Sequence, residues 1–325
     1  MKGLRRRSLG RRAAFAALLG ATACQRPGPL ARPQTLPPPA PDSRLQPLGV
    51  LEIDAGRFGA DGLSGLHVAP DLTLTAISDR GRWGQAGLVL APDGTPLGLE
   101  PIRAGALRDP VGRPLPRDIV SDAESLARLP DGSWLIGFER NHRIWRYPTL
   151  DAPAEPVIAP RELALAPGNG GLESLAVLAD GRWLAIAESQ RPKGEPAARM
   201  AWLRGPSGWR PLAYHPTPGF DPSDLCPLPD GGALVLERHF TLLGGFSARI
   251  VRLAPIPPGA TRLEGTEMAR LAAPLPTDNW EGISAFRHGV RRLVAVVSDD
   301  NQLILQRTLL AVLGEAEPEA VQSAS

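Results

Sequence analysis

Two segments of the chain repeat one pattern that begins and ends with a carboxylate. "ESLARLPDGSWLIGFE" runs from Glu124 to Glu139, and "ESLAVLADGRWLAIAE" runs from Glu173 to Glu188. Carboxylates that converge attract a hard cation such as Ca²⁺, which takes six to eight oxygen ligands. They can instead be neutralised by arginines, or stay far enough apart to remain solvated. The elements that position the acids decide among these outcomes.

The pattern recurs three more times along the chain. Aligned on the residue before the first apolar run, the copies begin at Ser64, Glu124, Glu173, Asp224 and Glu281, with spacings of 60, 49, 51 and 57 residues. Each copy reads as a short apolar run, a turn such as "PDG", and a second run rich in Trp, Val, Ile and Leu. This is the pattern of two antiparallel strands joined by a tight turn.

Repeats of this length predict an all-β chain that forms a single β-propeller of five or six four-stranded blades. After the second copy, "RIWRY" and "EPVIAP" are expected to form the third and fourth strands of a blade. "LGVLEI" from Leu48 and "QLILQRTLLAVL" from Gln302 could pair to close the ring. A β-sandwich is the alternative, but it does not explain the regular return of one motif.

In a propeller the first strand of each blade lines the central channel and the second runs back beside it. The acids before strand one and after strand two then lie at the same end of the channel. We predict a catalytic inner group at Glu124, Glu173 and Glu281. We predict metal-ligating oxygens at Asp79, Glu139, Glu188, Glu237, Asp299, Asp300 and Asn301. The predicted cofactor is Ca²⁺.

Three arginines directly follow second-strand acids: Arg80, Arg140 and Arg238. A guanidinium group matches the geometry of a phosphate oxygen pair, so these residues are candidates for contact with an anionic ligand. The alternative for the acids is structural, because such residues can accept hydrogen bonds from the backbone of the next blade and lock the ring.

Other reaction chemistries find little support. The five histidines show no zinc spacing such as H-E-x-x-H, and "GLSGL" around Ser64 is not a G-x-S-x-G elbow. "GNGG" at 168–171 lacks the lysine of a phosphate-binding loop and reads as the turn that delivers Glu173.

The N-terminus resembles an export signal. Residues 1–23 combine a basic start containing paired arginines with an apolar run too short to span a bilayer, which indicates a signal peptide, loosely of the twin-arginine type. Cys24 follows small residues, as in a lipobox, and is the predicted lipidation site; ordinary cleavage and a cytoplasmic protein with a basic tail are the alternatives. We expect a periplasmic or outer-membrane lipoprotein.

The remaining boundaries follow from composition. Residues 24–47 are proline-rich and predict a spacer behind the anchored cysteine, 48–313 form the propeller domain, and 314–325 are expected to be disordered. The net charge of +2 comes from the basic N-terminus. No basic stripe remains for nucleic acid, and we expect a monomer that contacts a membrane only through its lipid.

As a set, several motifs resemble the phytase-like propeller family, often described as having an esterase-like activity of phytase. They are "SDRG" at 78–81, "GGLESLA" at 170–176, "NWEGIS" at 279–284 and "SDDNQ" at 298–302. The resemblance covers about residues 48–312 and implies a secreted propeller with a Ca²⁺-assisted site for phosphoesters or other esters. Ser64 and the shortened copy at Asp224 depart from the pattern, and Lys193 is the only lysine after the signal, which argues against phytate.

Two functional classes therefore stand side by side. The first is a hydrolase that uses a metal at the acid-lined end of the channel to cleave a small ester or phosphoester. The second is a non-catalytic periplasmic or surface module that holds a ligand or partner at the same place.

Lipidation predicts a simple fractionation result. Cys24→Ala should move the protein from the membrane fraction to the soluble fraction, because the modified thiol is removed. Immunoblots of fractionated cells measure this, and unchanged membrane association of the variant would contradict lipidation at Cys24.

Overall fold

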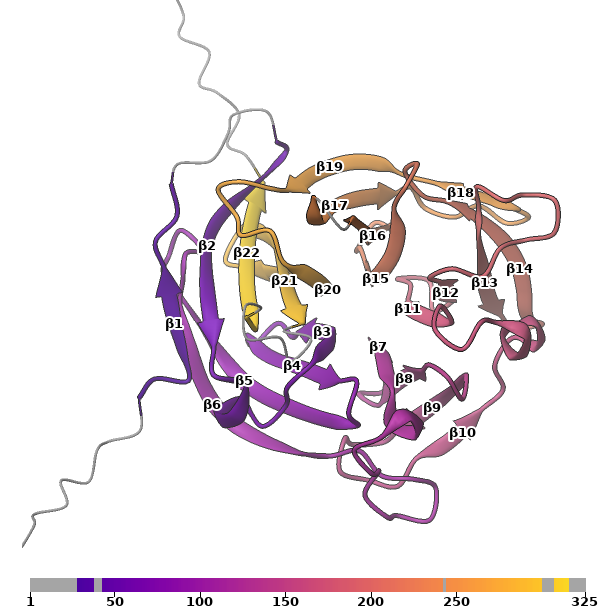
Figure 1. Cartoon of the computed structure of the whole chain (residues 1–325), viewed down its shortest axis with the longest axis horizontal. Coiled ribbons are helices and arrows are strands. Elements are labelled where there is room, and N and C mark those ends of the chain that lie inside the picture. Colours follow the sequence, from indigo (N-terminus) through magenta and orange to yellow (C-terminus); the bar gives the residue numbers. More distant parts are fainter. Residues whose placement is uncertain (1–27, 38–42, 242–243, 300–306, 316–325) are drawn as a thin grey trace, which may run out of the picture.

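The computed structural model describes residues 28–37, 43–241, 244–299 and 307–315. In this part of the chain, five sheets of mainly antiparallel strands stand around a central axis and form a five-bladed β-propeller (Figure 1). No helix there is long and apolar enough to cross a membrane. The predicted signal peptide and the predicted lipidation site Cys24 lie outside the described residues.

The first two blades each contain four strands in chain order. Blade 1 consists of β3 (Leu63–Val68), β4 (Thr73–Ser78), β5 (Arg82–Leu90) and β6 (Pro96–Ala106). Blade 2 consists of β7 (Ala123–Arg128), β8 (Trp134–Phe138), β9 (Arg143–Tyr147) and β10 (Glu155–Val157). The third and fourth strands expected from "RIWRY" and "EPVIAP" are confirmed.

Blades 3 and 4 are interleaved at their outer edges. Blade 3 consists of β11 (Leu172–Val177), β12 (Trp183–Ala187), β13 (Arg199–Gly205), β14 (Gly208–His215) and the parallel edge strand β18 (Arg262–Glu264). Blade 4 consists of β15 (Asp221–Pro227), β16 (Ala233–Thr241), β17 (Gly245–Leu253) and β19 (Thr266–Leu271). The strand β18 therefore belongs to one blade although it is inserted between two strands of the next.

Blade 5 joins the two ends of the chain. It consists of β20 (Asn279–His288), β21 (Arg291–Asp299), β22 (Leu309–Glu315), β2 (Leu45–Ile53) and β1 (Ala31–Gln34). The antiparallel pairing of β2 with β22, in which Val50 lies opposite Ala311, closes the ring as expected. Three short helices connect strands: α1 (Ala55–Phe58), η1 (Ile119–Ser121) and η2 (Arg161–Leu165).

The predicted domain boundaries need correction at both ends. Ala31–Gln34 falls within the proline-rich spacer, yet it pairs with β2, and Leu30 and Ala31 are buried. As an edge strand it tolerates Pro33, since a proline lacks only the outward-facing donor. At the other end β22 continues to Glu315, beyond the boundary expected at 313.

Aspartate–glycine turns explain why the first two strands of a blade form a hairpin. In blades 2, 3 and 4 the turn glycine has a φ of +84° to +88°, a conformation that favours glycine. The preceding Asp131, Asp180 or Asp230 accepts a hydrogen bond from the backbone two residues on, at 2.9–3.0 Å. These side chains fix the turn without help from other blades.

The hydrophobic core is divided into five clusters, one at each contact between neighbouring blades. Trp280 of blade 5, for example, is 1 % exposed and belongs to one cluster with Leu236 and Ile250 of blade 4. The five inner strands β3, β7, β11, β15 and β20 contact each other in a closed circle. Inner strands therefore line the channel, as expected.

Side chains on the inner strands also bond neighbouring blades together. Ser64 Oγ donates to the carbonyl of Ala123 at 2.7 Å, and Ser223 Oγ donates to that of Trp280 at 3.1 Å. Asp224 is 1 % exposed and accepts the backbone N–H of Ile283 in blade 5 at 2.8 Å. For Asp224 the structural interpretation of the repeat acids is therefore correct.

Asp224→Ala should destabilise the ring, because the buried N–H of Ile283 loses its acceptor. We expect a loss of about 1–3 kcal/mol in the free energy of unfolding, measured by urea denaturation. Asp224→Asn keeps one acceptor oxygen and should lose less. If both variants matched the wild type, the bond between blades 4 and 5 would have no measurable role.

Candidate metal and catalytic site

Every inner strand contains a β-bulge near its start. In all five blades the pairing of strand one with strand two skips a single residue of strand one. A bulge leaves the extra residue unpaired and re-aims its side chain. The skipped residues are Ser64, Glu124, Glu173, Ser223 and Glu281. The bulges thus place one unpaired residue of each blade at the same end of the channel.

The fourth blade corrects the sequence alignment by one residue. Its bulge is at Ser223, and the position that carries an acid in the other blades is occupied by Arg238. Ser223 and Arg238 are 15 residues apart, the separation that also holds from Glu124 to Glu139. This separation, which blades 1 to 4 share, was the signal that would have identified Arg238, whereas aligning on acids selected Asp224.

Glu237 consequently does not belong with the other predicted metal ligands. It is fully buried and accepts hydrogen bonds from the Tyr214 hydroxyl and, at 3.2 Å, from the backbone N–H of Thr217. Because side chains alternate along a strand, Glu237 faces blade 3 while Arg238 faces the channel. Glu237 therefore joins two blades.

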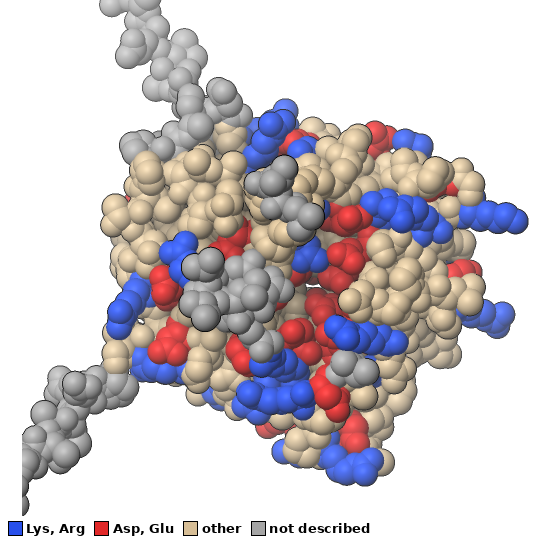
Figure 2. Space-filling model, in the orientation of Figure 1, with Lys and Arg blue, Asp and Glu red and all other residues tan. Residues whose placement is uncertain are grey.

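The acidic side chains at the bulge end of the channel form what we call the acidic ring. Figure 2 shows acidic side chains gathered around the centre of this face, with arginines among them. The ring consists of Asp79, Asp122, Glu124, Glu139, Glu173, Glu188, Glu281 and Asp299.

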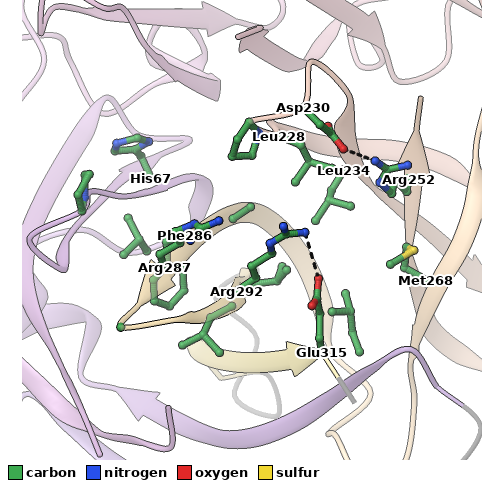
Figure 3. A pocket seen from close by; sticks show the side chains of 18 residues that line it. His67, Leu228, Asp230, Leu234, Arg252, Met268, Phe286, Arg287, Arg292 and Glu315 are labelled. Carbon is green, nitrogen blue, oxygen red and sulfur yellow. Dashed lines mark hydrogen bonds and ion pairs between the residues drawn. The ribbon is translucent and has the colours of Figure 1, made fainter. Parts of the chain in front are cut away.

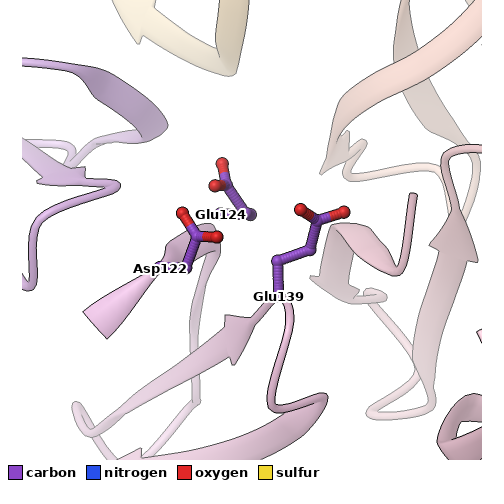
Figure 4. A group of neighbouring side chains, drawn as sticks. All are labelled: Asp122, Glu124 and Glu139. Atoms are coloured by element: carbon purple, nitrogen blue, oxygen red, sulfur yellow. The ribbon is translucent and has the colours of Figure 1, made fainter. Parts of the chain in front are cut away.

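Two groups of three carboxylates within the ring are close enough to share one ion. Asp122, Glu124 and Glu139 form the first group, and Glu139, Glu173 and Glu188 form the second. In each group one oxygen per residue lies within 4.8 Å of the others. Figure 4 shows how Asp122 and Glu124, at the start of β7, and Glu139, just after β8, extend into a common space. Glu139 belongs to both groups and links blades 2 and 3.

The loop before β11 holds Glu139 in place. One Glu139 oxygen accepts the backbone N–H groups of Gly170 and Gly171, the latter at 2.8 Å. Gly170 has a φ of +120°, and a Cβ at Gly171 would lie 2.2 Å from the His142 ring. Gly170 and Gly171 of "GNGG" are thus positions where a side chain would disturb the loop that binds Glu139. The second carboxylate oxygen of Glu139 accepts no hydrogen bond among those described.

Arg238 provides the internal positive charge of the ring. Its guanidinium donates to Glu188 at 3.0 Å, to the Asn279 side chain at 2.7 Å, and to Glu281. Although burial opposes the charged form, Glu281 and the neighbouring glutamates raise the pKa of Arg238, so it remains protonated. Arg238 therefore neutralises the side of the ring that contains Glu281 and Glu188, whereas no arginine donates to Glu124, Glu139 or Glu173 among the described hydrogen bonds.

Burial and mutual repulsion perturb the acids strongly. Burial and the carboxylate of Asp122 raise the pKa of Glu124 well above its usual range, and burial and Glu124 do the same for Glu173. Burial raises the pKa of Glu281 to about 7, although Arg238 opposes the shift. For Asp79, burial and the nearby Asp299 raise the pKa to about 7. Such perturbation is typical of functional sites.

The two other predicted anion contacts already have acidic partners. Arg80 donates to Asp61 at 3.0 Å and lies 3.7 Å from Asp79, and Arg140 donates to Asp122. With Arg238 bound to Glu188 and Glu281, each of the three guanidinium groups is paired with a carboxylate. The arginines act first as internal counter-ions of the ring.

Sequence reasoning missed two members of the site. Asp122 and Asn279 each lie two residues before a bulged glutamate. Each is opposite the acid that ends the second strand, Glu139 for Asp122 and Asp299 for Asn279. Their positions in "DAES" and "NWEG" were visible, but only the bulge shows that residues at this offset reach the channel. Asp300 and Asn301 lie outside the described residues.

The donor set fits Ca²⁺. Two oxygens on opposite sides of a Ca²⁺ ion are about 4.8 Å apart, since each Ca–O distance is about 2.4 Å. The oxygens of both carboxylate groups meet this limit, and all are hard ligands. The raised pKa values of Glu124 and Glu173 also show like charges that a divalent cation would stabilise.

Comparison with protein-family models gives one match. A model described as "Phytase-like: Esterase-like activity of phytase" matches residues 59–302. A search of curated protein sequences found no match.

Solved structures similar to this chain include two enzymes. One is the α-L-arabinofuranosidase of Podospora anserina, with a TM-score of 0.46 and 11 % identity over 88 % of this chain and 97 % of that one. Another is a gluconolactonase of Xanthomonas campestris, with a TM-score of 0.43 and 14 % identity over 89 % and 99 %.

The perturbed acids predict that the metal-free protein loses stability as the pH rises from 6.5 to 8.5. Glu281 and Asp79 have a pKa of about 7 when folded, above the values of 4.5 and 3.8 that apply when unfolded. In this window the folded state therefore binds more protons, and stability falls as they dissociate. His67, with a pKa lowered to about 4 from 6.5, gives the opposite slope mainly below this window and little of it above pH 7.

We expect the Tm in EDTA to fall by on the order of 5 °C over this range, measured by differential scanning fluorimetry. Glu173→Gln should reduce the fall, because it removes one repelling charge. The exposed Glu100 provides the control, and Glu100→Gln should leave the fall unchanged. Identical slopes in all three proteins would rule out repulsion in the ring as the cause.

Proposed function

Because the chain belongs to the family described as esterase-like activity of phytase, we propose that it is a Ca²⁺-assisted ester hydrolase whose active site is the acidic ring. The observation that carries this proposal is the pair of carboxylate groups that share Glu139. The purely structural acids Asp224 and Glu237 are bound to donors of a neighbouring blade or loop, whereas no such donor reaches Glu124 or Glu173 among the described hydrogen bonds.

The metal would be held by the carboxylates of blades 2 and 3. These are Asp122, Glu124, Glu139, Glu173 and Glu188. When bound, Ca²⁺ would supply a Lewis acid for an ester oxygen and lower the pKa of bound water. Glu139 fixes the geometry, because one oxygen is anchored to the loop before β11 and the other remains available.

Glu281 is the proposed general base. Arg238 and the Asn279 side-chain amide, which donates at 2.7 Å, orient it beside the carboxylate groups. A pKa of about 7 suits a group that takes a proton from water at neutral pH. Arg238 is then a positioning residue, since it holds both Glu281 and Glu188.

The charges of the ring favour carboxylic esters over phosphoesters. A phosphate brings one or two negative charges and requires unpaired donors such as free guanidinium groups. Arg80, Arg140 and Arg238 are already paired with carboxylates. An uncharged ester avoids repulsion by the acids. The proposal also includes export and attachment through Cys24, which would place the activity outside the cytoplasm.

Calcium binding and hydrolysis can be tested together. We expect Ca²⁺ to bind in isothermal titration calorimetry and to stimulate cleavage of p-nitrophenyl acetate more than p-nitrophenyl phosphate, with EDTA abolishing the effect. Glu173→Gln should weaken Ca²⁺ binding at least tenfold. Glu281→Gln should lower kcat by about 100-fold or more while retaining Ca²⁺ binding.

The outcomes separate the competing interpretations. Calcium binding without turnover of any ester would identify a binding module. If Glu173→Gln lowered the Tm equally with and without Ca²⁺, Glu173 would be a structural lock and the metal site would be wrong. Glu100→Gln again controls for a lost surface charge.

A further inference from the structure

A second cavity lies at the opposite end of the propeller from the acidic ring. It has a volume of about 830 Å³ and is lined by the hairpin ends of blades 1, 4 and 5. The strand β20 shows the separation, because its bulged Glu281 belongs to the ring while Phe286 and Arg287 line this cavity. Small-molecule sites in proteins commonly occupy 300–1,000 Å³.

Most of the cavity wall is apolar. Figure 3 shows Leu228, Leu234, Phe286 and Met268 around the space, with charged side chains between them. Phe286 is 8 % exposed and Leu234 is 3 % exposed, so their packing is set by the blade cores behind them. A wall of this kind suits a ligand with an apolar body, since removing each methylene group from water is favourable.

The charged residues of the wall leave one positive charge uncompensated. Arg252 is paired with Asp230, and Arg292 lies 3.8 Å from Glu315. Among the described residues, Arg287 has no hydrogen-bond or ion-pair partner, although it lines the same space. His67 adds no charge at neutral pH, because burial lowers its pKa to about 4.

We propose that this cavity binds an amphipathic monoanion, namely a medium-chain carboxylate, with its head group at Arg287 and its chain along Phe286, Leu228 and Met268. Polyanions such as nucleotides would meet only one free cation. A metal ion would find both lining acids, Asp230 and Glu315, engaged by arginines. Sugars require many polar partners that an apolar wall does not offer.

The site is separate from the proposed hydrolytic site, and its test does not depend on activity. Decanoate below its critical micelle concentration is titrated into the full-length protein in EDTA by isothermal titration calorimetry. We expect saturable one-to-one binding. Octanoate should bind about tenfold more weakly, because two buried methylene groups are lost. Decanol, which lacks the charge, should bind at least tenfold more weakly than decanoate.

Variants identify the place of binding. Arg287→Gln should weaken decanoate binding at least tenfold and leave decanol unchanged, and Met268→Trp should weaken both by filling the cavity. The exposed Arg262 of β18 is the matched control, so Arg262→Gln should have no effect on binding. Glu173→Gln should also bind decanoate normally, because it lies in the acidic ring.

Each contrary result overturns the proposal. Absence of saturable binding would reject the site. Equal affinity for decanoate and decanol would reject recognition of the carboxylate. If Arg287→Gln and Met268→Trp, with unchanged circular dichroism spectra and Tm, bound decanoate as the wild type does, the ligand would bind elsewhere.

Discussion

A single-residue bulge in each inner strand is the constraint on which the site depends. Along a regular strand successive side chains face opposite sides of the sheet, and both sides of a propeller blade are covered by neighbouring blades. The bulge inserts one residue that belongs to neither packed face. At Glu124, Glu173 and Glu281 this residue is a glutamate aimed at the channel. The next residue returns to the blade contact, as Asp224 does after Ser223.

The arrangement gathers like charges where water is scarce, and the fold compensates for them unevenly. On the side of blades 4 and 5, Arg238 satisfies Glu281 and Asn279 through direct hydrogen bonds. On the side of blades 2 and 3, Arg140 is bound to Asp122 and Arg238 reaches Glu188, but Glu139 relies on backbone amides, and no arginine donates to Glu124 or Glu173 among the described hydrogen bonds. This asymmetry distinguishes a region prepared for an external cation from a region that carries its own.

Local patterns explain which features the sequence could predict. Asp-Gly turns and alternating apolar residues act within one hairpin, so the repeat, the propeller and the channel end occupied by Glu124 and Glu173 were predictable. The one-residue error at Asp224 arose because residue type was matched in place of the 15-residue separation, shared by blades 1 to 4, that leads to Arg238. The cavity beside Arg287 was not predictable, since three hairpins far apart in sequence create it. The pairing of Ala31–Gln34 was likewise hidden by its prolines.

The closure of blade 5 has a consequence for how the chain folds. Val50 pairs with Ala311, so the contact that completes the ring joins residues from nearly opposite ends of the chain. Contacts of such high sequence separation form late and slow the folding of β proteins. Until then β2 and β22 present unpaired edges, which can pair with another copy of the chain as well as with each other. Exchange of the closing strand between two molecules is therefore the misassembly to which this topology is most exposed.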